Sequence, residues 1–418
     1  MVDLIREISQ QPVYLGVMFF LGAYPVLTGL YWITGSVYFS LHREAEDDEF
    51  YALEDHPLVS VVVAAHNEEA VIAETIECLL ELDWPRFEVM VVDDGSTDGT
   101  RATAAPYVEG GRIRLLAKEV NEGKAMALND ALPLLRGEIL LVVDADGRPN
   151  RDVLRWMVPH FVKVPRLAAV TGNPRVSNTT SLLTKLQAIE FSATVSVLRR
   201  AQATWGRLMT FSGICTALRK SAVEKVGRFK PEMATEDIAL AWQLQTDYAD
   251  VRYEPRAVFA MQVPETMAAW WSQRTRWARG LGQVLRAHSG VMTSWDKRRM
   301  WPVWLEAFGS ALWSHLFFAS AAFWVVALAA GVYGFGGNPI PNFWGLMIAS
   351  VLVGQISIGL WLDGRYDSTV RRYALWLPIY PIAYWILTSA ASVRALGPGM
   401  ARRPSGAVTW TSPERFDD

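Results

Sequence analysis

Residues 58–65 read LVSVVVAA, and this stretch decides the fold class. A short run of β-branched residues without polar alternation is typical of a strand that is buried on both faces of a parallel sheet. Similar strand-like runs occupy 87–92, 113–117 and 139–143, and stretches with helical apolar spacing occupy 69–82 and 123–135. This alternation predicts an α/β domain whose mostly parallel sheet is covered by helices on both sides.

Polar residues stand directly after three of these strands. Asn67 and Glu68 follow the first strand, Asp94 ends the second, and Asp144 and Asp146 follow the fourth. Ligands of open parallel sheets bind outside the carboxyl ends of the strands. We therefore expect all five side chains to lie at the ligand-binding edge of the domain.

The Asp144-Ala145-Asp146 motif predicts a metal site. A turn after a strand lets both carboxylates converge on one ion, and Mg²⁺ or Mn²⁺ typically takes one or two carboxylates together with substrate phosphates. Such an ion neutralises the charge that builds up on a departing diphosphate. The alternative interpretation is an ordinary polar turn.

A second group of residues suggests nucleotide binding. Asp94 is followed by Gly95-Ser96-Thr97-Asp98, and Lys124 comes after the next strand. The functional interpretation is that Asp94 contacts the base or ribose of a nucleotide and that Lys124 meets the same ligand. The alternative is a turn in which Ser96 or Asp98 caps the following helix.

Thr235-Glu236-Asp237 opens a helical stretch and supplies a candidate catalytic base. Carboxylates are common in a first helical turn because they complement the helix dipole. In the functional interpretation Asp237, beside Glu236, takes a proton from an acceptor hydroxyl. A helix N-terminus lowers a carboxyl pKa, and burial next to other carboxylates raises it.

The sequence Gln273-Arg274-Thr275-Arg276-Trp277 is the most specific motif. Helical spacing places Gln273, Arg276 and Trp277 on one face. Arg276 is suited to bidentate binding of a diphosphate, and Trp277 offers an apolar platform for a sugar ring. The alternative is a cationic helix at a membrane surface, where Trp and Arg are common.

Long apolar segments flank the predicted domain, and about 20 apolar residues suffice to cross a bilayer. We expect about four transmembrane helices, at 13–41, 303–332, 343–362 and 373–393. The basic loop before the last segment places the catalytic domain in the cytosol. Pro378 and Pro381 leave open whether the last segment crosses completely.

These segments give an expected domain plan. It comprises an N-terminal segment at 1–12, a catalytic domain at 55–290, an interface segment at 291–300, membrane segments within 301–396 and a tail at 397–418. Residues 181–204 form an amphipathic stretch that suits the membrane interface or packs as surface helices on the domain.

Composition narrows the function classes. A net charge of −3 gives no support for a nucleic-acid partner. Two cysteines argue against a secreted disulfide scaffold. Neither a zinc-type histidine spacing, nor a phosphate-binding Walker loop, nor a kinase or hydrolase signature is present.

Taken in order, the motifs resemble those of the processive family-2 membrane glycosyltransferases, which include cellulose, chitin and hyaluronan synthases. The resemblance covers nearly the whole chain and is closest to the bacterial branch that makes poly-β-1,6-N-acetyl-D-glucosamine. The segments that carry the closer match are YWITGSVYF (31–39), TGNPR (171–175), TEDIALAWQLQ (235–245), YEPRA (253–257), QRTRWARG (273–280), RMWP (299–302) and WTSPER (410–415).

The resemblance implies a GT-A-type domain that polymerises N-acetylglucosamine from UDP-N-acetylglucosamine and exports the product across the bacterial inner membrane as a biofilm polysaccharide. It implies donor contacts at Asp94, Asn67, Glu68, Lys124 and Asp144, a metal at Asp144 and Asp146, catalysis by Asp237 with Glu236, and diphosphate or acceptor contacts at Gln273, Arg276, Trp277, Ser212 and Gly213. It also implies a small membrane accessory subunit and regulation by cyclic di-GMP.

The chain departs from the family pattern in places. Ala64-Ala65-His66 stands where relatives often have a proline before Asn-Glu, and no arginine-rich cyclic-di-GMP receptor motif stands out. Two other functions remain open: a synthase of the chitin or hyaluronan type, and a non-processive enzyme that places one sugar on a lipid. The linkage position depends on which acceptor hydroxyl faces Asp237 and is not encoded in a motif.

Overall fold

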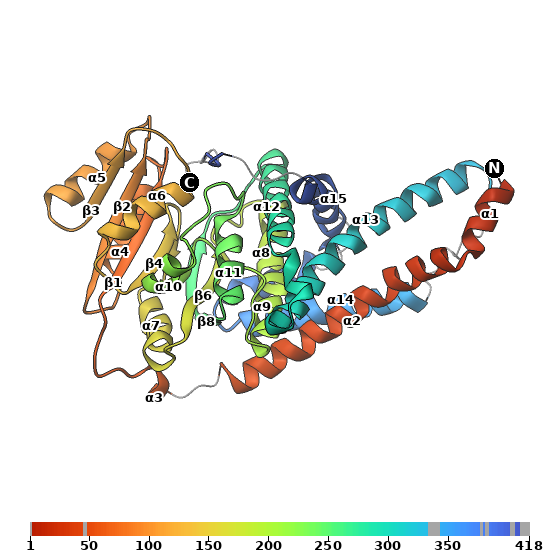
Figure 1. Ribbon diagram of the computed structural model, residues 1–418, viewed down its shortest axis with the longest axis horizontal. Coiled ribbons are helices and arrows are strands. Elements are labelled where there is room, and N and C mark those ends of the chain that lie inside the picture. Colours follow the sequence, from red (N-terminus) through yellow and green to blue (C-terminus); the bar gives the residue numbers. More distant parts are fainter. Residues whose placement is uncertain are drawn as a thin grey trace.

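The computed structural model describes residues 2–44, 48–332, 343–376, 379–380, 384–401 and 406–409. An α/β domain stands at one end, and long helices run from it toward the N-terminus at the other (Figure 1). The strands are β1 Val59–Ala65, β2 Phe87–Asp94, β3 Arg114–Lys118, β4 Ile139–Asp144, β5 Arg148–Pro149, β6 Leu167–Val176, β7 Thr216–Arg219 and β8 Asp250–Met261.

The helices of the α/β domain are α3 Asp48–Tyr51, α4 Ile72–Leu80, α5 Thr100–Glu109, α6 Lys124–Ala131, α7 Val153–Lys163, α8 Leu182–Glu190, α9 Val197–Thr204, α10 Lys220–Lys225, α11 Glu236–Thr246 and α12 Met267–Ala287. The remaining helices are α1 Val2–Gln10, α2 Pro12–His42, α13 Trp301–Ala329, α14 Phe343–Asp363 and α15 Trp385–Ala401. Shorter helical segments are η1 Leu132–Leu134, η2 Phe191–Ser196, η3 Ser289–Thr293, η4 Trp295–Met300 and η5 Ser368–Trp376.

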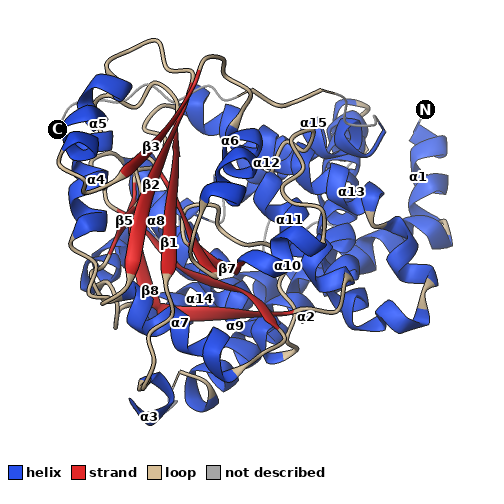
Figure 2. Ribbon diagram, turned by 60° about the vertical axis from the view of Figure 1, so that its left-hand side comes forward, coloured by secondary structure: helices blue, strands red, loops and turns tan. Residues whose placement is uncertain are grey.

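One sheet of eight strands organises the domain, in the order β3-β2-β1-β4-β7-β6-β8-β5 (Figure 2). Strands β3, β2, β1 and β4 are mutually parallel. β7 is antiparallel to both β4 and β6, and it joins this half of the sheet to the parallel pair β6 and β8. The predicted α/β class with a mostly parallel sheet is confirmed.

Two apolar cores lie on opposite faces of the sheet, because successive side chains of a strand point to opposite faces. In β1, Val61 and Val63 pack with α4 and α7 on one face. Val62 and Ala64 pack with α6 and α11 on the other. Burial on both faces explains why the first strand is a continuous apolar run.

The sequence predicted the first half of the sheet closely and the second half hardly at all. The four predicted strands correspond to β1 to β4, and the two predicted helices correspond to α4 and to α6 with η1. Strands β5 to β8 were not predicted. β6 includes Gly172 and Pro174, and β8 carries charged residues such as Arg252 and Glu254, so neither reads as an apolar run.

Among the described residues, three helical segments are long and apolar enough to cross a membrane: Pro12–His42, Trp295–Ala329 and Phe343–Asp363. They correspond to the first three predicted spans. The predicted fourth span at 373–393 lies partly outside the described residues; its described part includes the end of η5 and the start of α15. The prediction of a fourth span therefore stays a prediction.

The predicted interface stretch at 181–204 is one helical rod, formed by α8, η2 and α9, in which η2 is a π-helix. The rod does not present its polar face to solvent, because Gln187, Arg199 and Arg200 are all buried. Helix α14 packs on the π-helix: Gln355 Nε2 donates to the carbonyl of Ala193 at 2.8 Å.

A buried charged cluster ties this rod to α14 and β6, and we call it the Asp363 cluster. Asp363, at the end of α14, accepts hydrogen bonds from Ser196 Oγ (2.9 Å), Arg200 Nη1 (2.8 Å) and Arg175 Nη2. Arg200 also pairs with Glu44 just after α2, with 2.7 Å between Nη2 and Oε1. Helices α2 and α14 are thereby fixed to α9 and β6 of the α/β domain.

Candidate active site

The parallel register brings the acidic motifs to one edge of the sheet. Ala64 pairs with Asp144, and the next residue, Ala65, pairs with Asp93. The carboxyl ends of β1, β2 and β4 therefore lie side by side, as predicted from the positions of the motifs. Asp144 and Asp146 are both partly exposed at this edge.

Lys124 is the cation around which the carboxylates gather. Its ammonium pairs with Asp144 Oδ1 and lies 3.3 Å from Glu236 Oε1. Burial lowers the pKa of Lys124, but Asp144 and Glu236 outweigh that effect and raise it above its ordinary value. Lys124 is therefore permanently charged, and it joins the strand motif to the start of α11.

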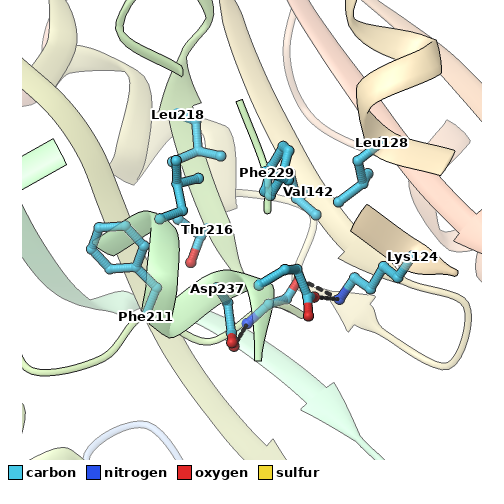
Figure 3. A pocket seen from close by; sticks show the side chains of 11 residues that line it. Lys124, Leu128, Val142, Phe211, Thr216, Leu218, Phe229 and Asp237 are labelled. Atoms are coloured by element: carbon cyan, nitrogen blue, oxygen red, sulfur yellow. Dashed lines mark hydrogen bonds and ion pairs between the residues drawn. The ribbon is translucent and has the colours of Figure 1, made fainter. Parts of the chain in front are cut away.

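Asp237 lies beside this cluster at the start of α11, and Figure 3 shows it with Lys124 among the side chains that line one pocket. Its Oδ2 accepts from the amide of Gly213 at 3.0 Å, and its Oδ1 accepts from the amide of Ile238 at 2.8 Å. Burial and the charge of Glu236 raise the pKa of Asp237 to about 6, against the opposing charge of Lys124. A carboxyl group with that pKa is suited to act as a general base near neutral pH.

An apolar pocket opens beneath these charged groups. It is lined by Lys124, Leu128, Val142, Phe211, Gly213, Thr216, Leu218, Phe229, Glu236, Asp237 and Leu240, and its labelled side chains are drawn in Figure 3. Burial of Asp237 beside this pocket is the largest cause of its raised pKa, and the charge of Glu236 adds to it.

Asp94, Asn67 and Glu68 lie at the same edge, where each takes part in hydrogen bonds within the protein. Asp94 is fully buried; its Oδ2 accepts from the amide of Gly123 at 2.7 Å, and its Oδ1 lies 3.1 Å from Lys118 Nζ. Asp94 thus fixes the loop that leads into α6 and Lys124. The predicted contact of Asp94 with a nucleotide stays a prediction.

Asn67 and Glu68 brace the loop that follows β2. Asn67 has a left-handed backbone conformation (φ 54°), and its Oδ1 accepts from the amide of Thr97 at 2.8 Å. The amide of Glu68 donates to Thr100 Oγ1 at 2.8 Å, and the residue is buried. The loops after β1 and β2 are therefore one connected unit at the edge of the sheet.

Helix α12 carries the Gln273–Trp277 motif past the start of α11. Arg276 is exposed and its Nη1 donates to the carbonyl of Ala234 at 3.4 Å, close to the start of α11. Gly280 packs directly on Thr235, so that a Cβ atom at 280 would lie 2.8 Å from Thr235 Cβ. Arg276 therefore lies near the start of α11, while Gln273 is half-buried on the same helix.

Three comparisons with known proteins bear on this site. The glycosyl transferase family 2 model matches residues 60–227. A poly-β-1,6-N-acetyl-D-glucosamine synthase from Staphylococcus epidermidis is 31% identical over 402 residues, covering 95% of this chain and 98% of the relative. One of the same name from Staphylococcus aureus strain COL is 32% identical over 410 residues, with the same coverage. The chain belongs to glycosyl transferase family 2.

A solved structure supports the fold of this family-2 glycosyltransferase. A mannosyltransferase from Pyrobaculum calidifontis, determined in complex with GDP-Man and Mn²⁺, matches with a TM-score of 0.59 at 22% identity. The match covers 90% of this chain and 99% of that one. The GT-A-type architecture predicted from the motifs is confirmed.

The carboxylates of this family-2 enzyme fit a divalent ion bound through two protein ligands. Asp144 and Asp146 offer hard oxygen atoms on a partly exposed turn, and Asp144 already bonds a cation, the ammonium of Lys124. No cluster of three or more potential ligand residues occurs in the part of the chain that the structure describes. A coordination sphere of two protein carboxylates and substrate phosphates is typical of Mg²⁺.

Arg274 is the residue of the glycosyltransferase motif that the sequence analysis overlooked. It is buried, its Nη2 lies 2.6 Å from Glu190 Oε2, and its guanidinium stacks on the ring of Trp277 at 4.2 Å. Trp277 packs against an apolar cluster that includes Phe191. The three-residue spacing of Arg274 and Trp277 places them on one helical face and could have revealed the pair.

Proposed function

We propose that this chain polymerises N-acetylglucosamine from UDP-N-acetylglucosamine into poly-β-1,6-N-acetylglucosamine at a membrane. The names of the relatives that align with 95% of the chain support this choice of product. The observation that carries the proposed chemistry is the gathering of Asp144 and Glu236 around Lys124, next to an Asp237 whose pKa is raised to about 6.

The proposed reaction is a single inverting displacement. Asp237 accepts the proton of the acceptor hydroxyl while that oxygen forms a bond to the anomeric carbon of the donor. The bond from the anomeric carbon to the phosphate oxygen breaks on the opposite face, and UDP departs. Glu236 sustains the raised pKa of Asp237 by its charge, and Lys124 supplies a permanent positive charge beside the leaving group.

Asp144 and Asp146 would hold a Mg²⁺ or Mn²⁺ ion in this reaction. When bound, the ion neutralises the negative charge that develops on the departing diphosphate. We assign Asn67, Glu68 and Asp94 to the nucleotide side of the donor pocket.

We assign Gln273, Arg276 and Trp277 to the diphosphate and the acceptor terminus, and Ser212 and Gly213 to the acceptor side. Arg276 is the exposed cation of this group and the one whose charge reaches Asp237. Trp277 has its ring held between Arg274 and apolar neighbours, so only part of it is open to a sugar.

We place the enzyme in the bacterial inner membrane, with the catalytic domain in the cytosol and the product leaving past the membrane helices. Three helical segments of spanning length and composition support membrane residence. A small accessory membrane subunit, with regulation by cyclic di-GMP, belongs to the same proposal and follows from the family resemblance alone.

The test is product analysis with the full-length protein in lipid nanodiscs. Radiolabelled UDP-N-acetylglucosamine should yield a long polymer whose linkage analysis gives 1,6 bonds, while UDP-glucose and GDP-mannose should give little product. A polymer with another linkage would indicate a chitin- or hyaluronan-type synthase. A single sugar on lipid would replace the proposal with a non-processive transferase.

A further inference from the structure

A buried arginine reaches from the interface rod to the active site. Arg199, in α9, is 3% exposed. Its Nη2 donates to Ser212 Oγ at 2.7 Å, and its Nη1 donates to the carbonyl of Gly172 at 3.3 Å. The guanidinium therefore joins α9 to β6 and to the turn that leads into β7.

That turn, Ser212 to Cys215, is held from several sides. The Ser212 amide donates to Thr171 Oγ1 at 3.2 Å, and the Gly172 amide donates to the carbonyl of Cys215 at 2.7 Å. Thr216 Oγ1 donates to the Ser212 carbonyl at 2.7 Å. Arg199 bonds the Ser212 hydroxyl, whereas Lys124 Nζ lies 3.5 Å from the Gly213 carbonyl on the other side of the turn. Charge-assisted hydrogen bonds are stronger than neutral ones.

The residue after Ser212 touches the base directly. The Gly213 amide donates to Asp237 Oδ2 from outside α11, whereas the Ile238 amide donates to Oδ1 from within that helix. The site leaves little freedom here: a Cβ atom at 213 would lie 2.8 Å from Lys124 Nζ and 3.4 Å from Asp237 Oδ2. A displacement of the turn would therefore displace the carboxylate.

The helix that carries Arg199 is itself fixed to a candidate membrane helix. The next residue, Arg200, is paired with Asp363 at the end of α14. Upstream, Gly359 of α14 is so close to the π-helix that a Cβ atom there would lie 2.6 Å from Ala193 Cα. Arg199 therefore extends from a rigid base toward the turn.

We propose that Arg199 is a positioning residue for catalysis: through Ser212 and the Gly213 amide, it holds the Asp237 carboxylate in the orientation that proton transfer requires. The inference rests on the proposed function only in taking Asp237 as the base. Arg199 itself touches neither donor nor acceptor in this account. It also gives a physical role to Thr171 and Gly172 of the TGNPR motif, which back the same turn.

The test compares four variants in nanodiscs: Arg199→Met, Arg199→Lys, Ser212→Ala and the double variant Arg199→Met/Ser212→Ala. The matched control is Arg207→Met, because Arg207 is a similarly buried arginine (4% exposed) that contacts Gly206 and Asp250 instead of this turn. Initial rates of UDP release give kcat and KM for the donor, and size-exclusion profiles verify folding.

We expect Arg199→Met to lower kcat by about 10²-fold, the loss that a misplacement of about 1 Å can produce, with the donor KM within about twofold of wild type. Arg199→Lys should recover part of the loss, because its ammonium still reaches a hydroxyl. The double variant should be little worse than either single variant, since both break one connection. Arg207→Met should keep the wild-type kcat.

Other results would overturn the inference. Equal losses in Arg199→Met and Arg207→Met, or additive losses in the double variant, would indicate a general structural role. If Arg199→Met does not fold, the test rests on Ser212→Ala, which is the smaller change. An unchanged kcat in Ser212→Ala would then contradict the proposal.

The experiment distinguishes a failure of the proposed function from a failure of the positioning role of Arg199. If the wild type uses a donor other than UDP-N-acetylglucosamine, the same kcat ratios are measured with that donor. If it turns over no donor, a cryo-EM structure of Arg199→Met decides: an intact 3.0 Å contact between the Gly213 amide and Asp237 Oδ2 would refute the positioning role.

Discussion

Two clusters of cations and carboxylates in this molecule differ in their access to solvent. Around Lys124, the side chains of Lys124, Asp144 and Glu236 are 15%, 29% and 14% exposed. In the Asp363 cluster, Arg200 and Asp363 are 0% exposed and Glu44 is 2% exposed. The first cluster can exchange a partner for a ligand, and the second is closed. The same ion-pair chemistry is therefore suited to catalysis in one place and to fixing helices in the other.

The largest effect should come from the open cluster. Asp237→Asn should reduce transfer by about 10²–10⁴-fold, the usual contribution of a general base. Because the amide is isosteric, donor affinity by calorimetry and the thermal unfolding midpoint should stay close to wild type. Near-normal turnover would remove Asp237 from the role of base.

The closed cluster should respond in stability. Asp363→Asn leaves Arg175 and Arg200 buried with one carboxylate fewer, and breaking a buried pair typically costs about 3–5 kcal/mol. The unfolding midpoint in detergent should fall by at least about 5 °C.

The matched control for that variant is Lys124→Met in the open cluster. It should abolish activity with a smaller loss of stability, because Asp144 stays partly hydrated. Equal destabilisation by the two variants would contradict the contrast between open and closed clusters.

Removal of divalent ions sharpens the contrast further. Excess EDTA should lower turnover by at least about 10²-fold, since a metal Lewis acid supplies several kcal/mol. Mg²⁺ or Mn²⁺ should restore the rate, and the unfolding midpoint should barely change, because the Asp363 carboxylate is already paired with Arg175 and Arg200. Full turnover in EDTA would remove the metal from the proposed reaction.

The smallest predicted effect is the pH dependence of the open cluster. Burial and Glu236 raise the pKa of Asp237 to about 6, so the base becomes protonated as the pH falls through 6. Below that value kcat should drop about tenfold per pH unit, whereas an ordinary aspartate would keep its charge to about pH 4. A kcat that stays level from pH 7 to pH 5 at saturating donor would contradict this assignment.

The features that could be predicted from the sequence are those that depend on a local pattern of residues. Strand β1 is a continuous apolar run, and the motifs at Asp144 and Asp237 stand at element ends that the fold then brings together. Gly172 and Pro174 lie within β6, and their presence is more typical of a loop than of a strand. The burial of Arg200 could not be predicted from the sequence, because its partner Asp363 lies 163 positions away and only the tertiary fold brings the two together.

The candidate site followed the same division. The positions of Asp144 and Asp237 at the ends of elements could be predicted from their motifs, and their chemical roles stay predictions. The sequence analysis did not identify Arg199 or Arg274 as site residues, because an arginine on an amphipathic helix is usually exposed to solvent. Their importance comes from partners on other elements, Ser212 and Glu190.

The contact between Gly280 and Thr235 has a consequence for protein engineering. Thr235 immediately precedes the helix that bears Glu236 and Asp237, and it is 3% exposed. One methyl group at 280 would occupy space that this threonine already fills. Attempts to engineer the enzyme for bulkier sugars should therefore keep glycine at position 280. The absence of a side chain there allows α12 to pack closely against the start of α11.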